Sequence, residues 1–231
     1  KLETIQMDRR TQEYTLPLDE KPVRLEVDPR FDVFRKLDKA EVPPALSQLF
    51  GSPDGLIVLP SESPFLEEYR QLATAWQKSQ EVQGKTLEIV TDAEIDALPD
   101  DKSAWVLGFE NKFEGAFKVT DEYATALGKE HIQKIIELTN DGSLVFAVPN
   151  KKDITHTQGF IGTTVKEAIP GLARLLPHYG KYSFLGFEGT RPNNVLKGNF
   201  PALQSPLHKA IPWEGKTTAT HVALNPEKAL T

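Results

Sequence analysis

Apolar and polar residues alternate in the first part of the chain. Every second residue is apolar in three runs: Ile5 and Met7; Tyr14, Leu16 and Leu18; and Val23, Leu25 and Val27. A period of two is typical of β-strands that bury one face. Because two or three strands are not a stable sheet alone, the pattern predicts the last antiparallel strands of a larger β domain, or a small sheet docked on the next domain. Pro43 and Pro44 make a stiff linker, so we expect this region to span residues 1–45.

Strands and helices alternate after residue 45. A continuous apolar run at 56–59 is typical of a strand covered on both faces, and further strands are predicted at 87–90, 104–109, 158–162 and 182–187. Apolar residues at helical spacing follow Ser63 and recur over 165–176. This alternation predicts an α/β domain over 46–190, a three-layer, mainly parallel sheet with helices on both faces. Residues 191–231, with several prolines, are predicted to form an irregular extension that packs on the α/β domain.

Local signals refine this prediction. Thr91 or Asp92, with Glu94 following, fits the cap of a short helix that ends at Leu98. The sequence Asn-Asp-Gly at 140–142 favours a β-hairpin between apolar segments at 132–138 and 144–148. Trp76 and Trp105 fall on apolar faces of a predicted helix and strand, so we expect both in the core rather than in a sugar-stacking site.

Composition excludes several kinds of function. The chain has 231 residues, 39% hydrophobic, with a net charge of −6 and no cysteine. No basic stripe indicates a nucleic-acid partner, and no apolar run reaches the roughly 18 residues of a membrane span. Without cysteine there are no disulfides, thiol nucleophiles or cysteine-ligated metals. The five histidines are never within four residues of one another, which excludes the two-histidine helix motif of zinc peptidases.

The chain also lacks a glycine-rich phosphate loop between a strand and a helix, and the G-x-S-x-G turn of the α/β-hydrolases. We therefore predict no catalytic residue, no metal ligand and no cofactor in this chain.

Three polar clusters remain as candidate ligand-binding sites. Glu110 and Asn111 follow a buried strand, at the sheet edge where α/β proteins bind ligands, although Asn111 also fits a helix cap. His178 and Tyr179 lie in a turn after a helix, where a histidine often contacts the last carbonyl groups instead.

The third cluster, with Asn194 and Lys197, follows the last predicted strand. Either these two residues face the same crevice as Asn111 or, as their turn-forming neighbours favour, they serve only the local turns.

Three stretches of the sequence resemble a known family. These stretches are the run from Leu175 to Gly189, the run from Asn194 to Phe200, and Val27-Asp28-Pro29 before the linker. Together they resemble the C-terminal region of bacterial exported proteins that are similar to zinc aminopeptidases of the alanyl-aminopeptidase type. The resemblance covers about residues 20–210. It implies an accessory domain whose partners are upstream domains of the same protein, a periplasmic or cell-envelope location, and a peptidase centre outside this chain.

The sequence leaves three functional interpretations open. The first is a non-catalytic accessory or binding domain, with a peptide or small polar ligand as a further partner. The second is a hydrolase or transferase that uses Glu110, His178 and Lys197, which requires the three clusters to converge within about 10 Å. The third is a small-ligand-binding protein that uses the same crevice without chemistry.

Overall fold

The chain is divided into two compact units. A computed structural model describes residues 2–117, 127–200 and 205–211. One unit combines Lys1–Arg35 with the segment that starts at Pro206, and the other contains Lys36–Ser205. The rest of the predicted C-terminal extension, 201–204 and 212–231, lies outside the described residues.

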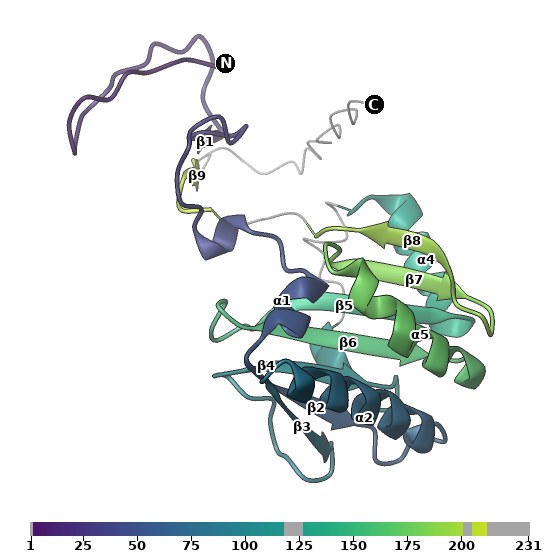
Figure 1. The fold of residues 1–231 in the computed structure, drawn as a ribbon. Coiled ribbons are helices and arrows are strands. Elements are labelled where there is room, and N and C mark those ends of the chain that lie inside the picture. The colour runs from purple at the N-terminus through teal and green to yellow at the C-terminus, as the bar shows by residue number, and fades with distance from the viewer. Residues whose placement is uncertain (1, 118–126, 201–204, 212–231) are drawn as a thin grey trace. The chain divides into compact units, whose positions relative to one another are not determined.

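The larger unit is built on a seven-stranded mixed sheet (Figure 1). The strand order is β3-β2-β4-β6-β5-β7-β8, and the first four of these strands are parallel to one another. β5 is antiparallel to both of its neighbours, and β8 is antiparallel to β7. The strands are β2 (Asp54–Leu59), β3 (Thr86–Thr91), β4 (Ser103–Leu107), β5 (Ser143–Pro149), β6 (Thr157–Thr163), β7 (Phe184–Glu188) and β8 (Asn193–Gly198).

Helices cover both faces of this sheet, so the predicted α/β fold is confirmed. The first face carries α1 (Leu46–Gly51), α2 (Leu66–Val82), η3 (Lys166–Ala168), α5 (Ile169–Leu175) and η4 (Leu176–Tyr179). The second face carries η2 (Glu114–Phe117) and α4 (Lys129–Asn140), and a further short helix, η1, spans Lys39–Glu41. Figure 1 shows α2 and α5 on one side of the sheet and α4 on the other.

Burial on both faces explains the continuous apolar runs. In β2, Ile57 and Leu59 pack in the cluster on the first face, whereas Leu56 and Val58 pack in the cluster on the second. Successive side chains of a strand point to opposite faces, so a strand between two helical layers has to be apolar at every position.

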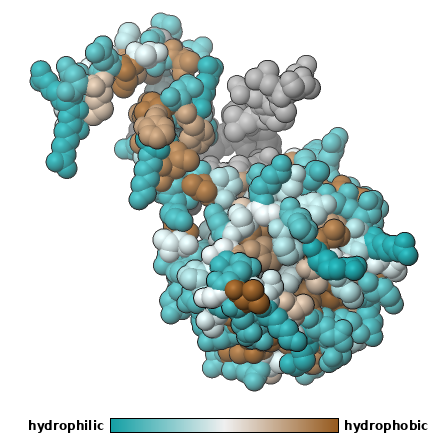
Figure 2. Space-filling view, viewed as in Figure 1, coloured by the Kyte–Doolittle hydropathy of each residue, from teal (hydrophilic) through white to brown (hydrophobic). Residues whose placement is uncertain are grey.

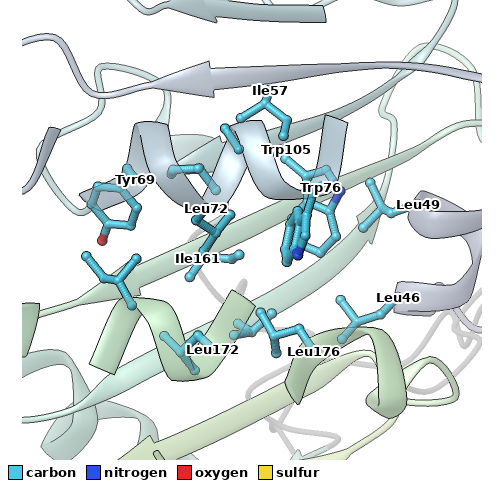
Figure 3. Packing of buried hydrophobic residues seen from close by; sticks show 14 of the residues in the cluster. Leu46, Leu49, Ile57, Tyr69, Leu72, Trp76, Trp105, Ile161, Leu172 and Leu176 are labelled. Atoms are coloured by element: carbon cyan, nitrogen blue, oxygen red, sulfur yellow. The ribbon is translucent and has the colours of Figure 1, made fainter. Parts of the chain in front are cut away.

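The two predicted core tryptophans lie on the first face (Figure 3). Trp76 and Trp105 are about 5% and 3% exposed, and their ring centroids lie 5.1 Å apart. The Trp76 indole N–H donates to the carbonyl oxygen of Ala173 at 2.8 Å, which joins α2 to α5. The core prediction for both residues is therefore confirmed.

The predicted hairpin at the Asn-Asp-Gly sequence is wrong, because α4 ends at Asn140 and leads directly into β5. Ile132, Ile135 and Leu138 recur every three residues and pack on the second face, so helical burial determines the structure before the turn.

The short helix predicted from Thr91 to Leu98 is absent, and this described segment forms turns. The capping contact still forms, because Glu94 accepts hydrogen bonds from the main-chain N–H and the hydroxyl of Thr91. Asp92, the alternative cap, instead accepts main-chain N–H groups from two other loops.

The prediction of irregular structure after residue 190 is also wrong for 193–198, which form β8 at the edge of the sheet. Only Leu196 is buried in β8, so the alternation that marks a strand is missing from its sequence. Pairing with β7 imposes the extended conformation.

The smaller unit contains a two-stranded antiparallel sheet, β1 (Arg24–Glu26) and β9 (His208–Ala210). Two main-chain hydrogen bonds extend the pairing, from the Val27 N–H to the Leu207 oxygen at 2.8 Å and from the Ile211 N–H to the Val23 oxygen at 2.9 Å. Within the described residues, the predicted runs at 5–7 and 14–18 lie in neither a helix nor a strand.

The substitution Gly159→Ala should destabilise the larger unit. A Cβ atom on Gly159 of β6 would lie 2.5 Å from the Trp105 ring and 2.7 Å from Leu49. Overpacking of this kind costs about 1–3 kcal/mol. The control is Gly51→Ala, because no atom lies within 4 Å of a Cβ at that position. Urea unfolding should give a lower midpoint for Gly159→Ala alone, and equal midpoints would contradict the packing described.

Candidate functional site

The carboxyl ends of β2, β4 and β6 meet at one edge of the sheet, which is the edge where open α/β sheets bind ligands. After β2 the chain passes to α2 on the first face, and after β4 it passes to η2 on the second face. A crevice is expected between two such strands, because the following connections leave in opposite directions. The predicted residues Glu110 and Asn111 lie at this position.

Asn111 closes the crevice with its own side chain. It is 3% exposed, and its amide NH₂ donates to the main-chain oxygens of Val58 at 3.1 Å and Leu107 at 3.2 Å. Its side-chain oxygen accepts from the Phe113 N–H at 3.1 Å. The amide thus joins β2 to β4 and caps the turn that follows β4. With both amide hydrogens in use, this side chain serves the fold rather than a ligand.

Asp92 ties the loops at the same edge together. It is 5% exposed, and its two oxygens accept from the Ser61 N–H at 2.9 Å and the Lys112 N–H at 3.0 Å. Burial by itself raises the pKa of Asp92, but the hydrogen bonds to Ser61 and Lys112 outweigh it and hold the pKa below its ordinary value. The loops after β2, β3 and β4 therefore converge on one ionised carboxylate.

An open depression of about 530 Å³ lies beside the closed crevice, next to the ends of β4 and β6. It is lined by Phe65, Phe109, Glu110, Glu114, Thr139, Thr163 and Thr164. The hydroxyls of Thr163 and Thr164 are already hydrogen-bonded to the Gly142 main chain. The two carboxylates are thus the polar groups in the lining that are best placed to meet a ligand, and two aromatic rings form part of the wall.

The Tyr69 hydroxyl lies close to this depression. Tyr69 is fully buried on α2, and its hydroxyl has no hydrogen bond of normal geometry within the described residues. Burial raises the pKa of this hydroxyl, and the charge of Glu110 raises it further. A buried donor without a partner costs about 1–3 kcal/mol, so the Tyr69 hydroxyl is less well satisfied than the Asn111 amide.

Three of the predicted site residues lie at the opposite edge of the sheet. Lys197 is near the end of β8, where Gly198 pairs with the first residue of β7, and its Nζ lies 5.8 Å from the centroid of the Tyr182 ring. Tyr179 on η4 contacts the same ring at a centroid distance of 6.0 Å. His178 precedes Tyr179 on η4 and is exposed. This cluster joins the second and third predicted sites, but it is separated from Glu110 by the length of the strands.

Asn194 lies at the carboxyl edge but far from Asn111. β8 is four strands from β4 in the sheet order, and strands lie about 4.8 Å apart, so about 19 Å separates these two strands. The Asn194 amide donates to the oxygens of Gly186 at 3.0 Å and Leu196 at 2.8 Å, across an irregularity in the β7–β8 pairing. The expectation that Asn194 and Lys197 face the crevice of Asn111 is therefore wrong, because the strand order separates all three.

Sequence reasoning missed Tyr69 and misassigned Asp92. Tyr69 was part of an apolar helix face, where no sequence signal distinguishes a tyrosine beside a depression from one in the core. Asp92 was a candidate helix cap, which identified its ability to accept main-chain N–H groups. The identity of those groups, in loops 31 residues before it and 20 residues after it, depends on the strand order.

The described residues contain no group of three or more His, Asp or Glu side chains placed to hold a metal ion. No helix among them has the length and apolar character needed to cross a membrane. The sequence matches no protein-family model and no curated protein.

Asp92→Asn should destabilise the protein by about 1–3 kcal/mol at pH 7. An amide offers one acceptor where the carboxylate offers two, so either the Ser61 or the Lys112 N–H loses its partner. Because the native pKa of Asp92 lies below its unfolded value, the contribution of the carboxylate is present above about pH 4 and is lost as the pH falls through the native pKa. The difference between wild type and variant should therefore shrink in acid.

Urea unfolding at pH 7 and at pH 3 measures this effect, with Asp101→Asn, in an exposed loop, as the control. A variant as stable as the wild type at pH 7 would show that Asp92 does not hold these loops.

Proposed function

We propose that this chain is a non-catalytic accessory domain of a metallopeptidase-like protein of the bacterial envelope. The observation that carries the non-catalytic role is the closed crevice, where the Asn111 amide and the Asp92 carboxylate are consumed by main-chain groups. The peptidase-like parent and the envelope location rest on the resemblance over residues 20–210. Upstream domains of the same protein are the partners that this proposal implies.

Physical requirements of catalysis support the same conclusion. Proton transfer needs groups within about 3 Å of the reacting atoms, and a nucleophile needs an adjacent base. Glu110 lies at the carboxyl edge, whereas His178 and Lys197 lie at the other, so the residues of the hydrolase interpretation do not converge. Opening the crevice for a substrate would break the three hydrogen bonds of Asn111. Each is worth about 0.5–1.5 kcal/mol, and more if a buried group is left unpaired.

The complete open reading frame tests this function. We expect it to encode an upstream helix with the zinc-binding H-E-x-x-H motif. In the complete protein, His178→Ala and Lys197→Ala should leave kcat/KM for an aminoacyl substrate within about twofold of the wild type, because a residue outside the reaction contributes nothing to transition-state binding. Substitution of the first histidine of the upstream motif is the positive control.

A 100-fold loss of activity in His178→Ala or Lys197→Ala with unchanged circular dichroism and melting temperature would overturn the non-catalytic role. A reading frame without a peptidase domain would overturn the proposal that the parent protein is peptidase-like.

The depression beside Glu110 favours a second candidate function, the binding of a small organic cation. Its volume of about 530 Å³ is in the range of small-molecule sites. Glu110 and Glu114 supply negative charge, and the rings of Phe65 and Phe109 supply the aromatic faces that attract cations. Such binding is compatible with an accessory domain, since it requires no chemistry.

Benzylamine, with benzyl alcohol as the uncharged control, tests this candidate in a thermal shift experiment. Benzylamine at ten times its dissociation constant should stabilise the folded state by ~1.4 kcal/mol. This corresponds to a rise in melting temperature of about 3–5 °C for a chain of this size. The double variant Glu110→Gln, Glu114→Gln should abolish the shift, and Glu167→Gln, an exposed glutamate elsewhere, should retain it. Equal shifts with both compounds, or none, would refute a cation site.

A further inference from the structure

The larger unit exposes its large hydrophobic side chains singly rather than as one broad face. They come from separate elements, for example Val82 on α2, Ile136 on α4 and Val195 on β8. Figure 2 shows the same on one face of this unit, where brown side chains form small separate patches among hydrophilic ones. The depression at the ends of β4 and β6 is a concave place where polar groups and aromatic rings meet instead.

Two carboxylates line this depression without a positive partner. Glu110 is exposed and Glu114 is half-buried. Among the ion pairs of the described residues, none involves either side chain. Lys112 lies between them in the chain, but its ammonium group is 5.0 Å from the centroid of the Phe113 ring. The negative charge of both glutamates is therefore available to a cation from outside.

The threonine hydroxyls of the lining direct their hydrogens to the main chain. The Thr139 hydroxyl donates to the Ile135 oxygen at 2.9 Å. The hydroxyls of Thr163 and Thr164 donate to the Gly142 oxygen at 3.2 and 3.4 Å. Ionised carboxylates only accept hydrogen bonds. The polar side chains of the lining are therefore acceptors, so a ligand that satisfies them brings its own N–H donors together with positive charge.

One more oxygen without a partner lies beside the lining. The buried Tyr69 hydroxyl has no hydrogen-bond partner in the described structure. Burial raises the pKa of Tyr69, and the two residues that also act on it, Glu110 and Thr163, both line the depression. Figure 3 shows Tyr69 at the other end of the first-face cluster from the two tryptophans. Buried hydroxyls nearly always have a partner, so the polar network is incomplete on this side of the depression.

Two phenylalanine rings are fixed in the wall. Phe109 packs over Gly162 of β6, where a Cβ atom would lie 2.5 Å from the ring. Phe65 directly precedes α2, and its main-chain N–H donates to the Ser63 hydroxyl oxygen at 3.1 Å. A ring that is already held in place loses little conformational freedom on binding. The wall thus offers flat surfaces on which a planar cation can stack.

We propose that this depression binds a guanidinium group, carried by an arginine side chain of a peptide partner. The proposal rests on the second candidate function, the binding of a small organic cation, and narrows it. A guanidinium group is planar and always charged, and its five N–H donors form a fixed fork that matches carboxylate oxygens. An ammonium group has only three donors and no plane, and a quaternary ammonium group has no donor. A free arginine would bring its α-carboxylate to the two glutamates, so an arginine within a chain fits better.

Isothermal titration calorimetry of the 231-residue chain with matched ligands tests the proposal. The ligands are N-acetyl-argininamide, N-acetyl-lysinamide and N-acetyl-citrullinamide, the last of which keeps the shape of arginine without its charge. We expect the argininamide to bind about tenfold more tightly than the lysinamide, because one additional hydrogen bond to a charged group is worth about that factor. The citrullinamide should give no measurable binding, and free arginine should bind more weakly than the argininamide.

Variants of the lining locate the site. Glu110→Gln and Glu114→Gln should each weaken binding of the argininamide about tenfold, since each removes a charged acceptor. Glu167→Gln, elsewhere on the surface, should bind it like the wild type. Phe65→Leu should reduce the preference for arginine over lysine, because it removes a stacking ring, and Phe65→Tyr should restore the preference. Melting temperatures without ligand show whether each variant is folded.

Several outcomes would overturn the guanidinium proposal. These are equal affinities for the argininamide and the lysinamide, binding of the citrullinamide, and unchanged binding in both glutamate variants. If benzylamine still raises the melting temperature in such a case, the cation site of the second candidate function remains. Free arginine that binds as tightly as the argininamide would assign the site to the free amino acid. No binding of any ligand would overturn the cation site as well. The reading frame tests the accessory role separately.

Discussion

Covering both faces of one sheet is the constraint on which the larger unit depends. Strands β2, β4 and β6 are buried at successive positions, so both faces of the sheet are covered there. The chain meets this requirement by passing to the first face after β2 and β6 and to the second after β4. Those alternating passages also create the gaps at the carboxyl edge, so the position of any site follows from the way the core is covered.

The two gaps at that edge differ in how far they are filled. Between β2 and β4, Asn111 and Asp92 occupy the crevice and satisfy main-chain groups of three loops. Between β4 and β6, by contrast, a depression stays open, with Glu110 at its rim and the Tyr69 hydroxyl buried nearby. The first arrangement stabilises the fold, and the second leaves room for a ligand.

The smaller unit presents the opposite situation. Its two strands bury little of their apolar face, whereas β4 and β6 of the larger unit are buried at every position. A fold with a complete core has no need of a partner for stability, but an amphipathic pair of strands does. The two units therefore differ in how much of their apolar surface they bury.

The sequence by itself determined the α/β class, the core tryptophans and most strands of the sheet. Each helix or strand carries the period of its buried face in its own residues, so the pattern can be recognised without knowing the neighbouring elements. It also located Asn111 as a cap and Glu110 at a strand end. It did not determine β8, whose single buried residue carries no alternation, or the end of α4, where helical burial overrode a turn signal.

The tertiary structure alone decided which candidate residues share a site. Strand order puts about 19 Å between β4, which precedes Asn111, and β8, which carries Asn194, and leaves Lys197 at the opposite edge beside Tyr182. It also brings Asp92 to the N–H groups of Ser61 and Lys112. Contacts between residues far apart in the chain depend on the order and direction of strands, and no spacing along the sequence encodes them.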